Sequence, residues 1–249
     1  MKRLCVLGLL ILIPFLSAAQ RASDYYKRAV AKFKGKDYAG AVVEYTRAIA
    51  IDTSSAVLYN NRGVAKAKLT YFSEALLDYE RAIHLDKKFY LAFFNRGNAY
   101  KEIHEYEMAL IAYDQSLDLK PNQKSALLNR GMIKYELSDY QGAISDFTLL
   151  LSLYPSHEKA LNNRGITLMM LNKYDEAIRD FSRAISMNPL YYKAYINRGV
   201  CFMERNESKR AINDFEVAIQ TKPMNGEGYY YRGLARIGNV SDIHSNSSN

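Results

Sequence analysis

One tripeptide recurs along this chain at a constant interval. Asn-Arg-Gly begins at residues 61, 95, 129, 163 and 197, and the variant Tyr231-Arg232-Gly233 follows after the same interval of 34 residues. Such a strict period indicates a repeat array, which buries a continuous core by stacking neighbouring repeats instead of closing one compact globule. The 249 residues therefore cannot be divided into domains by length alone.

Each repeat has the pattern of two helices. An aromatic residue or leucine comes four residues before the glycine, and alanine and aromatic residues three or four apart follow it. Glycine and alanine remove side-chain bulk where two helices cross closely. Proline, which cannot continue a helix, ends the later repeats. The predicted repeats are 22–55, 56–89, 90–123, 124–157, 158–191 and 192–225, and the first helix of a seventh is predicted over 226–238.

This arrangement closely resembles the tetratricopeptide repeat family. The resemblance implies an all-α fold, a right-handed superhelical solenoid of antiparallel helix pairs over residues 20–238. The sequence departs from the family pattern at Ala29, which replaces the glycine, and at Thr53 and Lys87, which replace proline. Residues 239–249 are rich in serine and asparagine and have little apolar surface to bury, so we expect a disordered tail.

The first residues have the features of a secretory signal peptide. Lys2 and Arg3 precede an uncharged run over 4–16, and small residues at 17–19 suit a signal peptidase. A membrane-spanning helix needs about 20 apolar residues, which is longer than this run. We therefore predict a signal peptide over 1–19 and an exported product, periplasmic or secreted, without stable membrane insertion after cleavage.

The composition argues against several classes of function. The net charge is +8 without a run of about five basic residues, so we expect no nucleic-acid partner. After residue 19, Cys201 is the single cysteine, expected to be a small buried residue, with pairing between chains as the alternative. The four histidines lack the spacing of a metal site, and no phosphate loop or nucleophile elbow is present. We expect no metal, no cofactor and no catalysis.

An arginine precedes the repeated glycine, and an acid usually follows 16 residues later. This interval leads from the first helix of a repeat to the second, so it predicts a partly buried, bidentate ion pair inside each repeat. A ladder of arginines for anionic ligands is the alternative, but it would not require an acid at a fixed offset. Ala112 breaks the rule after Arg96. The predicted structural pairs are Arg62 with Asp78, Arg130 with Asp146, Arg164 with Asp180, and Arg198 with Asp214.

The resemblance also implies where a partner binds. In this family the first helices line a concave face, and in this chain the corresponding positions are strongly apolar from the third repeat onward. Contiguous apolar patches tend to mark interfaces, and methionine adapts to irregular ligands. Core packing and self-association are the alternatives. The predicted groove residues are Phe94, Asn98, Lys101, Leu128, Met132, Tyr135, Asn162, Ile166, Met169, Ile196 and Met203.

Together these features favour an exported, non-enzymatic scaffold or adaptor. Its ligand is expected to be a peptide segment of a protein partner, held in a groove lined by methionine and aromatic residues. A holdase-like assembly factor for envelope or secreted clients is the alternative. Weak and promiscuous binding would distinguish the holdase from the adaptor.

Overall fold

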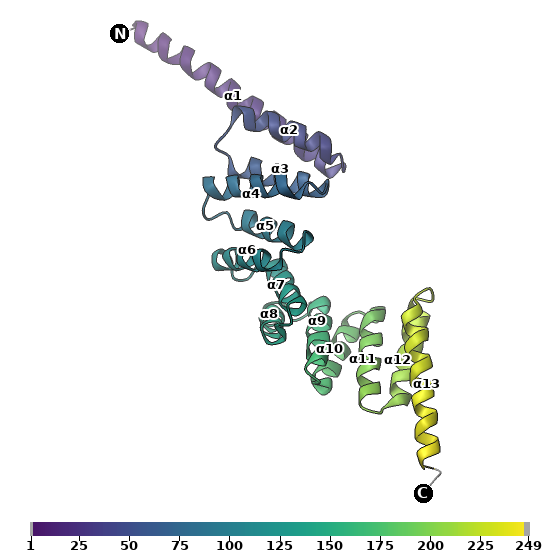
Figure 1. Cartoon of the computed structure of the whole chain (residues 1–249). Helices are drawn as coiled ribbons and strands as arrows, with labels where there is room; N and C mark the ends of the chain where they lie inside the picture. Colours follow the sequence, from purple (N-terminus) through teal and green to yellow (C-terminus); the bar gives the residue numbers. More distant parts are fainter. Residues whose placement is uncertain (1, 247–249) are drawn as a thin grey trace. The chain divides into compact units, whose positions relative to one another are not determined.

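The computed structural model describes residues 2–246, with side chains described for 18–237, and this part consists of helices without a strand (Figure 1). The predicted all-α fold of antiparallel helix pairs is confirmed. The helices are α1 (Lys2–Lys34), α2 (Tyr38–Ile51), α3 (Ala56–Lys68), α4 (Phe72–Leu85), α5 (Tyr90–Glu102), α6 (Tyr106–Leu119), α7 (Lys124–Glu136), α8 (Tyr140–Leu153), α9 (Glu158–Met170), α10 (Tyr174–Met187), α11 (Tyr192–Glu204), α12 (Ser208–Thr221) and α13 (Gly226–Asn246).

The helices form two compact units, Met1–Pro121 and Asn122–Asn249. Unit 1 contains α1 to α6, and unit 2 contains α7 to α13. Within each unit, the two helices of a repeat pack against each other, and the second helix also packs against the first helix of the next repeat. Each core is therefore continuous along its unit, as expected for stacked repeats.

The two helices of a repeat cross closely because glycine faces an aromatic ring. A Cβ atom added at Gly63, Gly97, Gly131, Gly165 or Gly199 would lie only 2.5–2.7 Å from a ring carbon on the second helix. These rings belong to Tyr79, Tyr113, Phe147, Phe181 and Phe215, which are at most 1% exposed. At Gly233 in α13, an added Cβ would meet no atom within 4 Å.

The turn inside each repeat requires one residue with positive φ. These residues are Lys36, Thr70, His104, Ser138, Asn172 and Asn206, with φ between 57° and 64°. The equivalent residue of the seventh repeat is Val240, a β-branched residue without a hydroxyl or amide to stabilise that conformation. Accordingly α13 extends past residue 238, where the sequence predicted its end, and includes much of the tail expected to be disordered. Residues 247–249 of that tail lie outside the described residues.

The predicted signal peptide belongs to the same helix as the start of the first repeat. Helix α1 runs from Lys2 to Lys34 without a break, and residue 1 lies outside the described residues. Cleavage after Ala19 and export stay predictions. Within the described residues, no helix is both long enough and apolar enough to cross a membrane.

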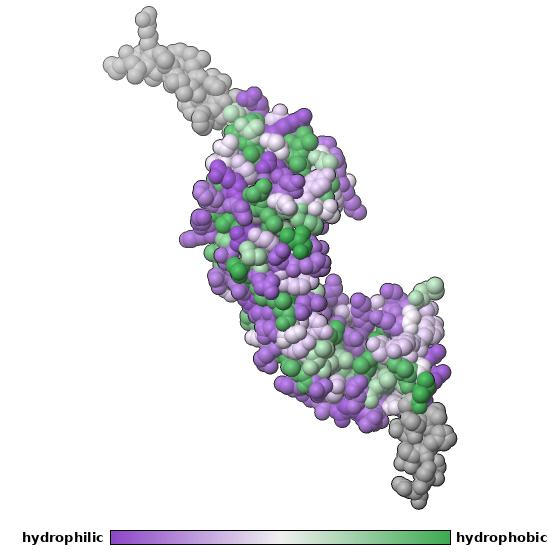
Figure 2. All heavy atoms as spheres, in the orientation of Figure 1, coloured by the Kyte–Doolittle hydropathy of each residue, from purple (hydrophilic) through white to green (hydrophobic). Residues whose placement is uncertain are grey.

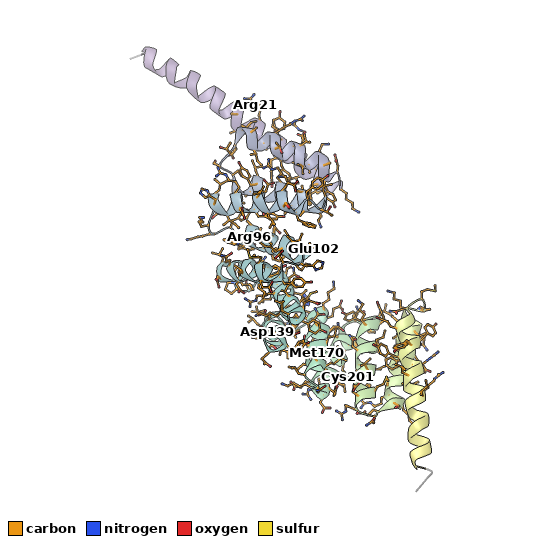
Figure 3. All side chains as sticks on the ribbon, viewed as in Figure 1. Arg21, Arg96, Glu102, Asp139, Met170 and Cys201 are labelled. Atoms are coloured by element: carbon orange, nitrogen blue, oxygen red, sulfur yellow. The ribbon has the colours of Figure 1, made fainter. Side chains whose placement is uncertain are left out.

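Cys201 is fully buried in α11 (Figure 3), which confirms its predicted place in the interior. Burial disfavours the charged thiolate and, together with the nearby carboxylate of Glu204, raises the pKa of the thiol to about 12. Because the thiolate is the reactive form, this environment makes pairing between folded chains unfavourable.

We therefore expect Cys201 to resist alkylation in the folded chain. At about pH 8, iodoacetamide should label the native protein roughly three orders of magnitude more slowly than the urea-unfolded protein, since an ordinary thiol has a pKa near 8.5. Mass spectrometry of the labelled protein against time measures both rates. Native labelling as fast as that of the unfolded chain would show that Cys201 is accessible.

Candidate functional site

The four predicted pairs of arginine and aspartate are in contact. In each pair, the arginine Nε and Nη2 donate to the two carboxylate oxygens at 2.5–2.9 Å. The aspartate side chains are 3–5% exposed and the arginine side chains 17–20%. The hydrogen bonds that Arg164 donates to the Asp180 carboxylate raise the pKa of the Arg164 guanidinium above its ordinary value. The structure joins Arg62 to Asp78, Arg130 to Asp146, Arg164 to Asp180, and Arg198 to Asp214.

A further hydrogen bond of these arginines links neighbouring repeats, which the sequence analysis missed. Arg164 Nη1 donates to Thr148 Oγ1 at 3.0 Å, and Arg198 Nη1 donates to Ser182 Oγ at 3.0 Å. Each hydroxyl lies on the second helix of the preceding repeat, 16 residues before its arginine. This constant spacing of 16 residues could have predicted the contact from the sequence. These arginines therefore join repeats, and their donors are directed to protein groups instead of a groove.

In unit 2, the first helices of successive repeats lie on the inner side of the stack. Helix α7 contacts α9, and α9 contacts α11. Among the described residues of this unit, successive second helices are not in comparable contact. Closer spacing on one side of a stack means that the stack curves toward that side, so the exposed faces of α7, α9 and α11 point toward its hollow side.

A cavity of about 140 Å³ lies between α7 and α9, on this inner side. Its apolar walls include three predicted groove residues, Met132, Tyr135 and Ile166, with Phe147 of α8 as a further wall. A cavity of this size lined by apolar groups accommodates a benzene-sized group. The complete lining is Met132, Tyr135, Glu136, Phe147, Asn163, Ile166 and Thr167.

The cavity combines an adaptable apolar wall with polar groups. Met132 is 41% exposed, whereas Tyr135 and Ile166 are half-buried and held by their neighbours. Burial raises the pKa of Tyr135, so its hydroxyl is neutral and can donate a hydrogen bond. Glu136 is exposed and can accept hydrogen bonds from peptide N–H groups or pair with a cation. The arrangement suits an apolar side chain with its backbone lying across the opening.

The remaining predicted groove residues of unit 2 fall into two classes. Leu128, Met169 and Met203 are half-buried on the first helices, outside the lining of the cavity. Asn162 and Ile196 are only 3% and 5% exposed, so the prediction that these two line a binding surface is wrong.

Both buried residues are used in packing between repeats. The Asn162 side-chain oxygen accepts a hydrogen bond from Asn197 Nδ2 at 3.0 Å, which links α9 to α11. Ile196 belongs to an apolar cluster with Phe215 of its own repeat and Ala235 of the next repeat. The neighbouring repeat therefore covers the positions that a ligand would have to contact.

The predicted groove residues of unit 1 lie on α5 and have partners within the unit. Phe94 packs against Tyr113 with ring centroids 6.0 Å apart, and Asn98 accepts a hydrogen bond from the Tyr113 hydroxyl at 2.8 Å. Lys101 Nζ lies 2.9 Å from a Glu102 carboxylate oxygen. Their contact with a ligand stays a prediction.

Unit 1 contains a larger cavity that the sequence analysis did not predict. Its volume is about 780 Å³, and it lies between the start of the first repeat in α1 and the residues from Ile51 to Leu58. Ala18 and Ala19, which belong to the predicted signal peptide, form part of its wall. Cleavage after Ala19 would remove these two residues and with them part of the cavity wall.

Exposed apolar side chains also occur away from the inner face. Val43, Leu77 and Ile111 occupy equivalent positions on the second helices of unit 1 and are 49%, 66% and 51% exposed. Figure 2 shows apolar side chains scattered between polar ones over the visible surface.

In the part of the chain that the structure describes, no three histidine, cysteine or acidic residues are grouped to hold a metal ion.

Part of the chain, including the cavity of unit 2, is similar to known protein families. Two family models described as tetratricopeptide repeat match residues 94–158 and 158–191, which include the helices around the cavity of unit 2. No curated protein sequence matches the chain at a significant level.

Several solved structures have a similar fold. PilF of Pseudomonas aeruginosa superimposes with a TM-score of 0.74 at 15% identity, covering 88% of this chain and 99% of its own. A tetratricopeptide repeat protein of Parabacteroides merdae gives 0.72 at 24% identity, covering 89% and 88%. YrrB, a tetratricopeptide repeat protein with an unusual peptide-binding site, gives 0.67 at 21% identity, covering 76% and 97%. At these identities the similarity concerns the fold alone.

Proposed function

We propose, from the premise that this chain is a tetratricopeptide repeat protein, that it is a scaffold whose unit 2 binds a peptide segment of a protein partner. The fold is that of protein–protein interaction scaffolds. The proposed binding site is the cavity between α7 and α9, where Met132, Tyr135 and Ile166 surround one bulky apolar side chain of the ligand.

The observation that carries this proposal is the cavity itself. It brings together three groove residues from two successive first helices, and one of them, Met132, is exposed although it is apolar. Methionine repacks at low cost, so this wall can adapt to side chains of different shape. Burial of one apolar side chain contributes about 1.5–3 kcal/mol, which corresponds to roughly tenfold or more in affinity.

The polar rim indicates how the peptide backbone would be held. Glu136 and Asn163 lie at the same cavity and offer a carboxylate and a side-chain amide. A ligand with an apolar anchor flanked by a basic residue would satisfy Glu136 as well as the apolar wall. We place this activity outside the cytoplasm because residues 1–19 have the composition of a signal peptide, and we assign the chain no catalytic role.

A holdase-like function is the second candidate. It is favoured by further methionines on the first helices of unit 2, Met169 and Met203, which are half-buried and could contact varied apolar segments. An adaptor would select few partners, whereas a holdase would bind many weakly.

The test compares the partners captured by the wild-type chain and by the double variant Met132→Ser, Ile166→Ser. Chemical crosslinking followed by affinity purification from the native envelope or secreted fraction identifies the partners. Loss of a few partners in the double variant is expected for the adaptor, because the apolar walls of the cavity are removed. Loss of many weakly held clients would instead support the holdase-like function.

Leu77→Ser is the matched control, since Leu77 is 66% exposed on a second helix of unit 1. It removes similar apolar surface away from the cavity and should leave the captured set unchanged. Circular dichroism melting verifies that all variants are folded. An identical set of partners for the wild type and the double variant would place the binding surface elsewhere.

A further inference from the structure

Helix α13 is the first helix of a repeat, but no second helix covers it. In the described part of the chain, the helices that pack against α13 are α12 and α11 of the preceding repeat (Figure 1). In the other repeats the chain turns back, and the second helix covers one face of the first. Helix α13 instead continues to Asn246. Its uncovered side, called the open face below, contains Tyr229, Arg232, Gly233 and Ile237.

The open face carries apolar side chains that are buried or half-buried in the other repeats. Tyr229 and Ile237 are 46% and 69% exposed. Leu127 and Leu161 occupy the position of Tyr229 in repeats that have a second helix, and they are at most 1% exposed. The outer face of a repeat that caps a stack is ordinarily polar. An apolar face at this place therefore indicates an interface.

Gly233 leaves a space that an aromatic ring fills in the other repeats. At Gly199, the equivalent residue of the preceding repeat, an added Cβ would lie 2.5 Å from the Phe215 ring of the second helix. At Gly233 an added Cβ would meet no atom within 4 Å. The backbone of α13 can thus be approached closely by a ring, which a side chain at this position would prevent.

Arg232 supplies a charge on the same face. Its equivalent, Arg198, donates through Nε and Nη2 to Asp214 of the second helix, both at 2.8 Å. Arg232 Nη1 lies 4.0 Å from the carboxylate of Glu216, a half-buried residue on the preceding repeat. A carboxylate that approaches from the open face can form the closer, bidentate contact seen in the other repeats.

These features specify the chemistry of a partner. In the preceding repeat, Asp214 comes directly before Phe215, so one helix presents the carboxylate and the ring together. We propose that the open face of α13 docks an amphipathic helix of a partner protein that carries an acid followed directly by phenylalanine or tyrosine. The ring of this helix lies over Gly233, and its carboxylate pairs with Arg232.

A second copy of the chain fits this face less well. The two acids of α13, Glu227 and Asp242, are not followed by an aromatic residue, so two α13 helices facing each other do not present the required pair. The second helices that carry the pair have its aspartate and its ring buried inside their own repeats. The open face therefore favours a helix from another protein.

The test uses a fluorescein-labelled synthetic peptide with the sequence of α12, Ser208–Thr221, as the probe. Fluorescence anisotropy measures its affinity for the full chain, and saturable binding is expected. In the peptide, Phe215→Ala should weaken binding about tenfold or more, because the ring is no longer buried. Asp214→Asn should weaken it by about tenfold as well, because Arg232 loses its charged acceptor.

Gly233→Ala is the decisive variant of the chain. The added methyl group meets no atom of the free chain but occupies the place of the ring, so it should weaken peptide binding about tenfold and leave the chain folded. Gly226→Ala is the matched control, because an added Cβ there also meets no atom and lies at the start of the same helix. It should bind the peptide like the wild type. Circular dichroism melting verifies the fold of both variants.

The double variant Met132→Ser, Ile166→Ser separates this proposal from the cavity between α7 and α9. It should bind the α12 peptide like the wild type, because the open face is a different surface. Loss of binding in this double variant would place the peptide in the cavity and overturn the docking proposal, without bearing on the proposed function.

Three further results would overturn the proposal. The first is a wild-type chain that does not bind the peptide. The second is equal affinity of the wild type and Gly233→Ala, as expected if the peptide only exchanges with α12 inside its own repeat. The third is a wild-type dimer, seen by sedimentation velocity, that Gly233→Ala dissociates, because it would assign the open face to a second copy of the chain.

Discussion

Asp180→Ala is expected to destabilise the protein by about 3–5 kcal/mol, because it leaves the partly buried guanidinium of Arg164 without its counter-charge. Asp180 is 4% exposed and accepts hydrogen bonds from Arg164 Nε and Nη2, both at 2.7 Å. The double variant Arg164→Leu, Asp180→Ala removes both charges and should recover most of this loss. Urea unfolding followed by circular dichroism gives both free energies of unfolding.

A surface pair provides the control for this comparison. Lys173 Nζ and the Glu176 carboxylate are 3.9 Å apart, and both side chains are about half exposed. Lys173→Ala is therefore expected to change the free energy of unfolding by less than about 0.5 kcal/mol. Equal stability of Asp180→Ala and the double variant would mean that the guanidinium of Arg164 is solvated, contrary to the structural role assigned to it.

Gly165→Ala and Gly233→Ala are expected to change stability in opposite directions. At Gly165, an added Cβ would lie 2.6 Å from the Phe181 ring, which is fully buried and cannot move away. Overpacking of this kind costs about 1–3 kcal/mol, against up to about 1 kcal/mol that alanine contributes as a better helix former. We expect a net loss of about 1–2 kcal/mol.

Gly233 occupies the same position of the repeat in α13, but an added Cβ has open space around it. Only the helix propensity then changes, so Gly233→Ala should raise the free energy of unfolding by up to about 1 kcal/mol. Thermal melts of the two variants measure the contrast. A similar loss in both would show that glycine is needed at this position for a reason other than the close crossing.

The regular part of the fold could be predicted because each rule acts within one repeat. The period places the glycine four residues after an aromatic residue or leucine and opposite another aromatic residue, and this determines the crossing of the two helices. The pairing of Arg164 with Asp180 follows from the same interval in one repeat. Even the exception at Ala112 is visible in the sequence, and the structure adds that Arg96 Nε has no acceptor there.

Features that depend on a neighbouring repeat could not be predicted from a position alone. Leu128 and Ile196 are both the fifth residue of their repeats, yet Leu128 is half-buried and Ile196 is buried. The difference comes from the side chains that the adjacent helices present, such as Phe215 of α12 and Ala235 of α13 in the cluster of Ile196. The contact of Thr148 with Arg164 also joins two repeats, but its constant spacing of 16 residues could have been found in the sequence.

The central claim, that the cavity of unit 2 receives an apolar side chain of a peptide, is tested most directly by methyl NMR of methionine-labelled protein. The probe is a peptide that the wild-type chain selects from a random display library. Met132 lines the cavity, whereas Met108 and Met224 are exposed at other sites and act as internal controls. The account predicts a shift of the Met132 signal on peptide addition without a change at Met108 or Met224. Shifts confined to Met108 or Met224, with Met132 unchanged, would contradict it.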